Sequence, residues 1–320
     1  MSGPVRTEDV PTTEIAPDAP APIVEITPSH AARVGAHTVL RALPMRLRRT
    51  VGPWCFVDHL PPAGPPNAGM GIGPHPHIGL QTVTWLVAGE VLHTDSLGSE
   101  QLIRPGELNL MTAGHGIVHA EETPATYGGA SHAVQLWVAQ PERTRHGAPA
   151  FEHHAELPRV DLGGVIGRVL VGDFAGATSP ARRDTDHTGV ELVLHHGRHA
   201  LPLRREHESA IVVLDGVVSI AGAPAGSDTT VVPGHLAYLG AGREELVLDA
   251  PVTTRLLLLA GIPFEARPLM WWNFVARTRD EMDAAHDAWQ SGDGGRFGPV
   301  RSALERIPAP PPPWQNASAR

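Results

Sequence analysis

Cysteine is almost absent from this chain of 320 residues, in which Cys55 is the single example. No internal disulfide can therefore form, and a lone cysteine is most often a small buried side chain. No apolar run approaches the roughly 18 residues of a membrane-spanning helix, and segment 256–260 is far too short. The first six residues also lack the basic-then-apolar order of a signal peptide. These absences predict a cytoplasmic protein that does not enter a membrane.

Basic residues are also few. Lysine and arginine number 25 against 34 aspartates and glutamates, which gives a formal net charge of −9. A general nucleic-acid-binding protein needs a basic surface, so we expect no direct contact with nucleic acid. Hydrophobic residues make up 42% of the chain, which is enough for a sizeable core, and the length suffices for two domains.

Long helices are not expected, because 34 glycines and 32 prolines favour turns and short strands. Short strands are predicted at 83–87, 91–95, 108–111, 134–138, 210–214 and 235–239. The second half repeats the layout of the first, since 17 residues separate Gly89 from Gly106 and 18 separate Gly216 from Gly234. Two copies of one β-sandwich or β-barrel explain this repeat most simply.

Two pairs of potential metal ligands lie in the first half. His75 with His77, and His119 with Glu121, each have i, i+2 spacing, which places both side chains of a pair on one face of a strand. If the two strands are neighbours, three imidazoles and one carboxylate converge on one cation. That donor set suits Fe, Mn, Ni, Cu or Zn. The alternative is that the His-x-His pair is a chance product of a chain with 19 histidines.

Residues next to these pairs are candidates for a supporting role. Pro74 and Pro76 have no N–H, so the strand that carries them belongs at a sheet edge or a bulge. Gln81 can orient a ligand or a bound water, or can make an ordinary sheet contact. His115, in a Gly-His-Gly bend, can carry protons to the pocket or lie at its rim. His93 is interpreted as structural or exposed.

The chain divides into four regions on this evidence. Residues 1–25 have no apolar period and are predicted to be a disordered tail. A metal-binding domain spans 26–150, and a second domain that lacks metal ligands spans 151–305, because only His207 stands where a second His-x-His would be expected. A helix is predicted at 278–291, with Met282, Ala285 and Trp289 on one face. The proline-rich tail 306–320 is interpreted as an extended arm.

The residues around the ligand pairs resemble the pirin family, a two-domain group within the cupin superfamily. The resemblance rests on segments 74–79, 93–98 and 105–121, and it extends over most of residues 27–300. It implies an all-β fold of two tandem cupin barrels, which are double-stranded β-helices or jelly rolls, with a C-terminal helix.

By this resemblance His75, His77, His119 and Glu121 correspond to the family's metal ligands, and Fe(II) is the usual ion. Two departures alter the charge of the pocket: Gln81 stands where the family commonly has Glu, and His115 stands where it commonly has Arg. A third departure is the Trp271-Trp272 pair, where many members carry Gly-Pro before Phe-Val. We interpret this pair as strengthening the packing between domains.

The resemblance leaves three functions open. The family includes quercetin 2,3-dioxygenases, which implies that this protein opens the heterocycle of a small aromatic, flavonol-like substrate with O2, and that Glu121 also acts as the catalytic base. The alternative is a non-catalytic, metal-dependent regulatory module that binds a protein partner, as nuclear members of the family bind transcription factors. A third is an isomerase or hydrolase that acts without oxygen.

Overall fold

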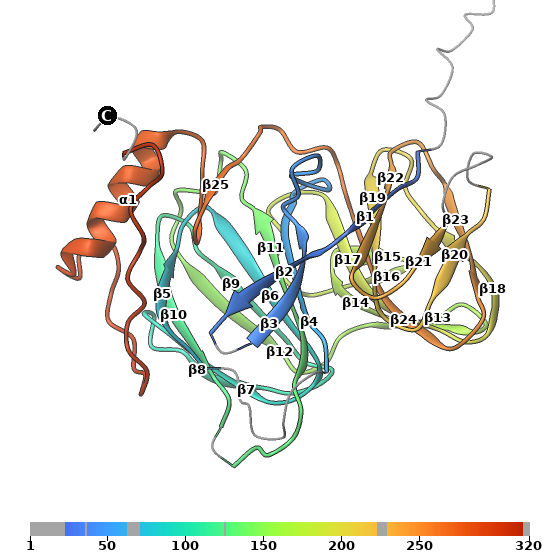
Figure 1. Cartoon of the computed structure of the whole chain (residues 1–320), viewed down its shortest axis with the longest axis horizontal. Coiled ribbons are helices and arrows are strands. Elements are labelled where there is room, and N and C mark those ends of the chain that lie inside the picture. Colours follow the sequence, from blue (N-terminus) through green and yellow to red (C-terminus); the bar gives the residue numbers. More distant parts are fainter. Residues whose placement is uncertain (1–22, 36, 63–70, 125, 223–228, 316–320) are drawn as a thin grey trace, which may run out of the picture.

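The computed structural model describes residues 23–35, 37–62, 71–124, 126–222 and 229–315. The tail expected at 1–25 lies almost entirely outside these residues. Two β-barrels lie side by side, and the one helix of the described chain lies at the outer end of the first barrel (Figure 1). The all-β fold with two barrels and a C-terminal helix is therefore confirmed.

Each barrel combines a seven-stranded sheet with a four-stranded sheet. In spatial order, the large sheet of the first barrel contains β12 (Ala150–His154), β9 (Leu108–Thr112), β6 (Leu80–Ala88), β11 (His132–Ala139), β4 (Trp54–Leu60), β3 (His37–Leu43) and β2 (His30–Val34). Its small sheet contains β5 (Gly71–His77), β10 (Ile117–Glu122), β7 (Val91–Asp95) and β8 (Glu100–Ile103).

The second barrel repeats this arrangement, as the internal repeat predicts. Its large sheet contains β1 (Glu25–Pro28), β22 (His235–Gly240), β19 (Glu208–Asp215), β24 (Thr254–Gly261), β17 (His187–Leu194), β14 (Val165–Val171) and β13 (Arg159–Asp161). Its small sheet contains β18 (Gly197–Pro202), β23 (Glu245–Ala250), β20 (Val218–Ile220) and β21 (Thr230–Val231). Two hairpins complete the strands, β15 (Asp173–Phe174) with β16 (Ala177–Thr178) and β25 (Leu269–Trp271) with β26 (Phe274–Ala276).

The two large sheets share one hydrophobic core between the barrels. Trp85 of β6 belongs to the same buried cluster as Val212 of β19 and Leu257 of β24. Trp54 also crosses this boundary, because its indole Nε1 donates to the carbonyl of Ala260 at 3.2 Å. Burial of apolar surface between the sheets holds the barrels in a fixed relation.

The two ends of the described chain cross to opposite barrels. Strand β1 pairs with β22 of the second barrel, although a boundary between tail and first domain was expected at residue 26. Strand β12 pairs with β9, so the first barrel extends past the boundary expected at residue 150. Near the C-terminus, Phe274 and Trp289 share a cluster with Ile78 and Val118 of the first barrel. These segments lie across the predicted domain boundaries because each pairs with a sheet edge or packs on an apolar face.

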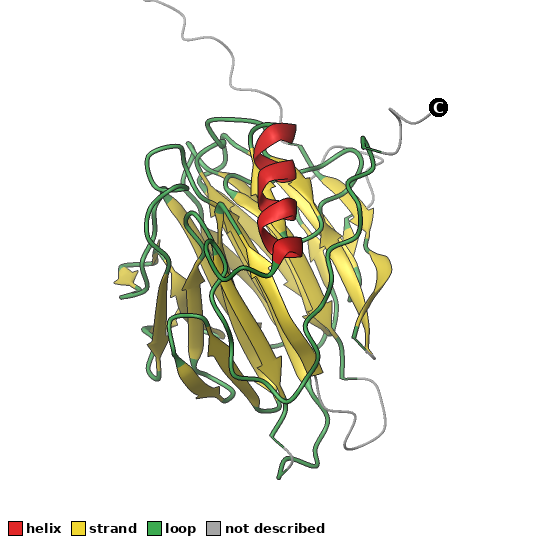
Figure 2. Ribbon diagram, turned by 90° about the vertical axis from the view of Figure 1, so that its left-hand side faces the viewer, coloured by secondary structure: helices red, strands yellow, loops and turns green. Residues whose placement is uncertain are grey.

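The helix α1 (Arg279–Ser291) forms as predicted and lies against the outer side of the first barrel (Figure 2). The hydroxyl of Thr278 accepts from the backbone N–H of Glu281 at 3.2 Å and caps its first turn. Its buried residues are Met282, Ala285 and Trp289. None of the described residues forms a helix with the length and hydrophobicity that a membrane crossing requires.

The proline-rich segment docks on the protein instead of forming a free arm. The backbone N–H of Ile307 donates to the carbonyl of Pro74 at 2.9 Å, and the indole of Trp289 donates to the carbonyl of Ile307 at 3.0 Å. Trp314 donates to Asp283 of α1 at 3.0 Å. The expected free arm is thus wrong for residues 306–315, because these contacts satisfy groups on α1 and β5; residues 316–320 lie outside the described chain.

Gly79, between β5 and β6, should be intolerant of a side chain. Its φ is +67°, and a Cβ would lie 2.1 Å from the carbonyl oxygen of Val275. Gly79→Ala should lower the free energy of unfolding by about 3 kcal/mol or more in chemical denaturation. Gly98→Ala is the matched control, since its φ is +87° but nothing lies within 4 Å of the added Cβ, and backbone strain alone costs about 1–2 kcal/mol. Equal losses in the two variants would contradict this steric argument.

Candidate metal centre

The two predicted ligand pairs lie on neighbouring strands. β5 is an edge strand that pairs with β10, and His75 lies opposite His119 in their register. An edge position suits Pro74 and Pro76, because neither residue has an N–H to donate. The register shifts between His119 and Glu121, which is the mark of a bulge that re-aims side chains.

Three imidazoles meet at this place. His75, His77 and His119 are all buried, and one ring nitrogen of each lies within 4.8 Å of the others. Nε2 of His77 is 3.1 Å from Nε2 of His119. Two nitrogens that each lie about 2.1 Å from one ion, at a right angle, are about 3 Å apart. The two nitrogens therefore have the separation of two ligands on one ion.

Backbone carbonyls fix the tautomers of two of these histidines. Nδ1 of His75 lies 2.9 Å from the carbonyl of Gly73, and Nδ1 of His77 lies 2.9 Å from the carbonyl of Asn273. A carbonyl oxygen can only accept, so each Nδ1 carries the proton and each Nε2 keeps its lone pair. A lone pair at Nε2 is what metal coordination requires.

His119 is oriented through two further side chains. Its Nδ1 is 3.4 Å from Nδ1 of His93, whose Nε2 is 3.1 Å from Oδ2 of Asp95. Because the carboxylate accepts, His93 donates to it from Nε2 and accepts at Nδ1. His119 therefore donates from Nδ1, and its Nε2 keeps a lone pair. Phe151 stacks on His93 at 4.3 Å between centroids and holds the ring plane.

The interpretation of His93 as structural or exposed did not include this role. The signal was present in the sequence, because His93 and Asp95 have the same i, i+2 spacing as the ligand pairs. In the structure their strand β7 pairs with β10, so that Asp95 lies opposite His119 and His93 lies opposite Glu121.

The electrostatics of the cluster fit a divalent cation. The lone pairs of His77 and His119 face each other at 3.1 Å and repel unless a positive charge lies between them. Burial lowers the pKa of His75 to about 4, and it lowers the pKa of His77 and His119 well below the usual value. The imidazoles are therefore neutral at physiological pH, which is the form that binds metals.

Glu121 lies on the wall of the same cavity. The hydroxyl of Thr84 donates to its Oε1 at 3.4 Å. Burial raises the pKa of the Glu121 carboxyl, and a cation at the histidine cluster would favour its ionised form. The compact group thus consists of three histidines, with the carboxylate beside it.

Gln81 and His115 are not among the residues that line this cavity. Gln81 lies on the face of β6 opposite Thr84, because the two residues are three apart on one strand. Its Nε2 donates to the hydroxyl of Thr112 at 3.0 Å. His115 lies exposed, with Nδ1 3.0 Å from the carbonyl of Gly147. Gln81 therefore makes a sheet contact and His115 a turn contact.

The cavity beside the histidines has a volume of about 360 Å³, within the usual range for small-molecule pockets. Phe56 and Trp137 stack at 3.9 Å between centroids on one part of its wall. Two arginines also line it. Arg41 makes two hydrogen bonds of 2.7 Å to Asp58, whereas Arg33 has no ion-pair partner among the described residues. The cavity is therefore suited to a small organic molecule that carries both an aromatic surface and polar groups.

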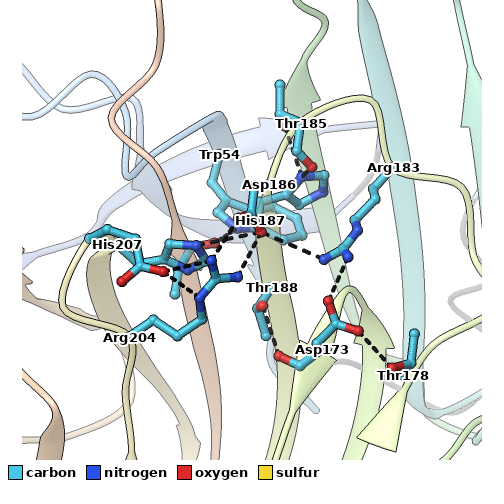
Figure 3. A network of polar contacts seen from close by, with 12 residues as sticks. Trp54, Asp173, Thr178, Arg183, Thr185, Asp186, His187, Thr188, Arg204 and His207 are labelled. Atoms are coloured by element: carbon cyan, nitrogen blue, oxygen red, sulfur yellow. Dashed lines mark hydrogen bonds and ion pairs between the residues drawn. The ribbon is translucent and has the colours of Figure 1, made fainter.

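The second barrel has a different polar network around His207 (Figure 3). Asp186 accepts from Arg204 at 2.9 and 2.8 Å, and it lies 3.5 Å from Nε2 of His207. The interior of this barrel is filled by apolar side chains, among them Leu246 and Leu248. His207 thus lies beside the ion pair of Arg204 with Asp186, and its barrel has a leucine-rich interior.

Comparison with known proteins agrees with this architecture. The Pirin model matches residues 36–138, and the model of the pirin C-terminal cupin domain matches residues 190–298. The chain belongs to the pirin family. A Pseudomonas aeruginosa relative of this pirin, named "Putative quercetin 2,3-dioxygenase PA1205", is 43% identical over 312 residues, which cover 96% of each chain. A pirin-like protein of Caulobacter vibrioides is 35% identical over 83% of this chain and 95% of its own.

Solved structures share the fold of this pirin. A quercetin 2,3-dioxygenase from Acinetobacter baumannii superimposes with a TM-score of 0.85 at 41% identity, covering 91% of this chain and 96% of that one. A bacterial pirin from Escherichia coli in complex with nickel(II) superimposes with a TM-score of 0.59 at 18% identity, covering 75% of this chain and 100% of its own.

Asp95→Asn should disturb the histidine cluster without unfolding the turn after β7. The new amide would donate to His93, which would then donate to His119 and force the proton of His119 onto Nε2. We expect the affinity for Ni²⁺, measured by competition with a chelator, to fall about 10–100-fold. Glu100→Gln on β8, at an exposed position, should bind Ni²⁺ as the wild type does. Unchanged affinity in the Asp95 variant would mean that His93 does not set this tautomer.

The metal-free protein should lose stability as the pH falls from 6.5 toward 4. Burial lowers the pKa of His59, His75 and His187 to about 4, whereas an imidazole in the unfolded chain titrates near 6.5. Between these values the unfolded chain binds more protons, so acid favours unfolding; above pH 6.5 this dependence vanishes. Thermal melts at pH 7 and pH 5 measure the effect, and a Tm at pH 5 that equals the Tm at pH 7 would refute it.

Proposed function

We propose that this pirin is a metal-dependent dioxygenase of the quercetinase type, with Fe(II) as its ion, which opens the heterocycle of a flavonol-like substrate with O2. The observation that carries the proposal is the cluster of three buried, neutral imidazoles beside a cavity of about 360 Å³. The names of the Pseudomonas and Acinetobacter relatives support the same reaction.

His75, His77, His119 and Glu121 would hold the ion. Three imidazoles and one carboxylate suit Fe(II) and also Mn, Ni, Cu or Zn. When bound, the ion supplies Lewis acidity toward the hydroxyl and carbonyl oxygens of a flavonol and toward O2. The surrounding contacts of Gly73, Asn273 and His93 keep the three imidazoles in the tautomer that can bind.

Glu121 is the residue best placed to take the hydroxyl proton of the flavonol. Burial raises the pKa of its carboxyl, which makes the ionised form a stronger base, and the Thr84 hydroxyl contacts Oε1. Removal of that proton leaves an electron-rich, enolate-like anion that is more reactive toward oxygen. The aromatic walls formed by Phe56 and Trp137 suit a planar substrate.

Anaerobic mixing of the Fe(II)-loaded protein with quercetin, followed by admission of air, tests the proposal. The flavonol absorbance should decay and oxygen should be consumed. Glu121→Gln should be slower by about 100-fold or more, with its metal content measured in parallel. Glu122→Gln is the matched control, because Glu122 accepts from the Ser302 hydroxyl and does not line the cavity. Unchanged flavonol absorbance with the wild-type protein would overturn the proposal.

The same experiment separates the other functions that the sequence leaves open. An isomerase or hydrolase would change the substrate spectrum before air is admitted. A regulatory module that binds a protein partner would take up metal and consume no oxygen.

A further inference from the structure

The hairpin of β25 and β26 places a strained residue at the metal cavity. Trp272 has a φ of 51°, in the left-handed region that bulky residues avoid. Trp271 pairs with Phe274, so Trp272 is the first residue of a two-residue loop, a position at which glycine is favoured when φ is positive. Strain of this kind persists only where the surrounding structure enforces it, and it concentrates at ligand sites.

The two adjacent tryptophans have different surroundings. Trp271 packs against the helix and the C-terminal segment, with its ring centroid 5.8 Å from His286 and 5.9 Å from Trp314. No ring contact joins Trp272 to either of these described residues. The ring plane of Trp272 is instead at 90° to that of Phe274, with 5.4 Å between the ring centroids, and Trp272 lines the cavity. Both tryptophans pack against the cluster that contains Phe274 and Trp289, which lies between the C-terminal segment and the first barrel and not between the two barrels as expected. Trp272 in addition lines the cavity.

The backbone of the same loop supports the metal cluster independently of the indole. The carbonyl of Asn273, next to Trp272, accepts from Nδ1 of His77 at 2.9 Å. This contact depends on the course of the loop and not on the side chain at position 272. A residue that adopts the same φ without strain should preserve it.

We propose that Trp272 is a specificity-determining residue that selects planar aromatic ligands at the metal centre. Its indole forms a wall against which a ligand ring packs, on the cavity that Phe56 and Trp137 also line. This proposal rests on the proposed function in one respect, namely that the ligand binds at the metal centre. It does not require that the protein oxidises the ligand. The positive φ of Trp272 accompanies a ring that lines the cavity.

Trp272→Gly removes the indole and also relieves the strain, because glycine adopts a positive φ freely. The Ni²⁺ affinity should stay within about twofold of the wild type, since the Asn273 carbonyl keeps its place. The Kd of quercetin and of 4-nitrocatechol, measured anaerobically by absorbance titration of the Ni²⁺-loaded protein, should rise about tenfold or more. Trp272→Phe restores an aromatic face and should recover most of the affinity.

Trp271→Leu is the matched control from the same hairpin. It should lower the Tm, because it removes the contacts with His286 and Trp314, and it should leave both Kd values within about twofold. Wild-type affinity of Trp272→Gly for both aromatic probes would overturn the proposal. Loss of Ni²⁺ binding in that variant would overturn it too, because Trp272 would then act through His77.

Failure of the proposed function would give a different result. A wild-type protein that binds both probes and consumes no oxygen refutes the dioxygenase, while the comparison of variants still decides the role of Trp272. A wild-type protein that binds neither probe refutes the selection of planar aromatic ligands as well.

Discussion

The antiparallel pairing of β5 with β10 is the constraint on which the rest of the site depends. This register sets His75 opposite His119, and a slip of one residue would turn the ligands of one strand to the other face of the sheet. The prolines of β5 confine that strand to an edge, where one of its sides needs no hydrogen-bond partner. An edge strand can be approached by later parts of the chain, and the docked C-terminal segment uses this freedom at Pro74.

The contacts that orient the imidazoles come from distant parts of the molecule. Gly73 is local to His75, but Asn273 is separated from His77 by almost two hundred residues, and His93 with Asp95 belongs to a third strand. Each contact fixes a proton on Nδ1, so that Nε2 is left to bind. The affinity for metal is therefore linked to the packing of the hairpin between β25 and β26, although this hairpin supplies none of the three imidazoles.

Local patterns in the sequence were sufficient to predict much of this protein. The i, i+2 spacing placed each ligand pair on one face of a strand, and the helical period identified the buried face with Met282, Ala285 and Trp289. The docking of Ile307 on Pro74 and the crossing of β1 to β22 were beyond such patterns, because each joins residues more than two hundred positions apart. The contact of His77 with the Asn273 carbonyl could not be predicted either. Every residue has a backbone carbonyl, so no residue type marks the one that accepts from His77. Gln81 was left open between a role at the pocket and a sheet contact, because the turn at Gly79 interrupts the alternation between β5 and β6.

The exchange of end segments has a consequence for the integrity of the whole molecule. The first strand of the described chain completes the sheet of the second barrel, and the last helix covers the first barrel. Proteolytic cleavage of the linker between β12 and β13 would thus leave two fragments that stay associated. The N-terminal fragment would supply β1 to the second barrel, and the C-terminal fragment would supply α1 to the first. Expressed alone, the second barrel would lack β1 from its large sheet, and the first barrel would lack the helix that covers it. Each barrel is consequently completed by a segment from the far end of the chain.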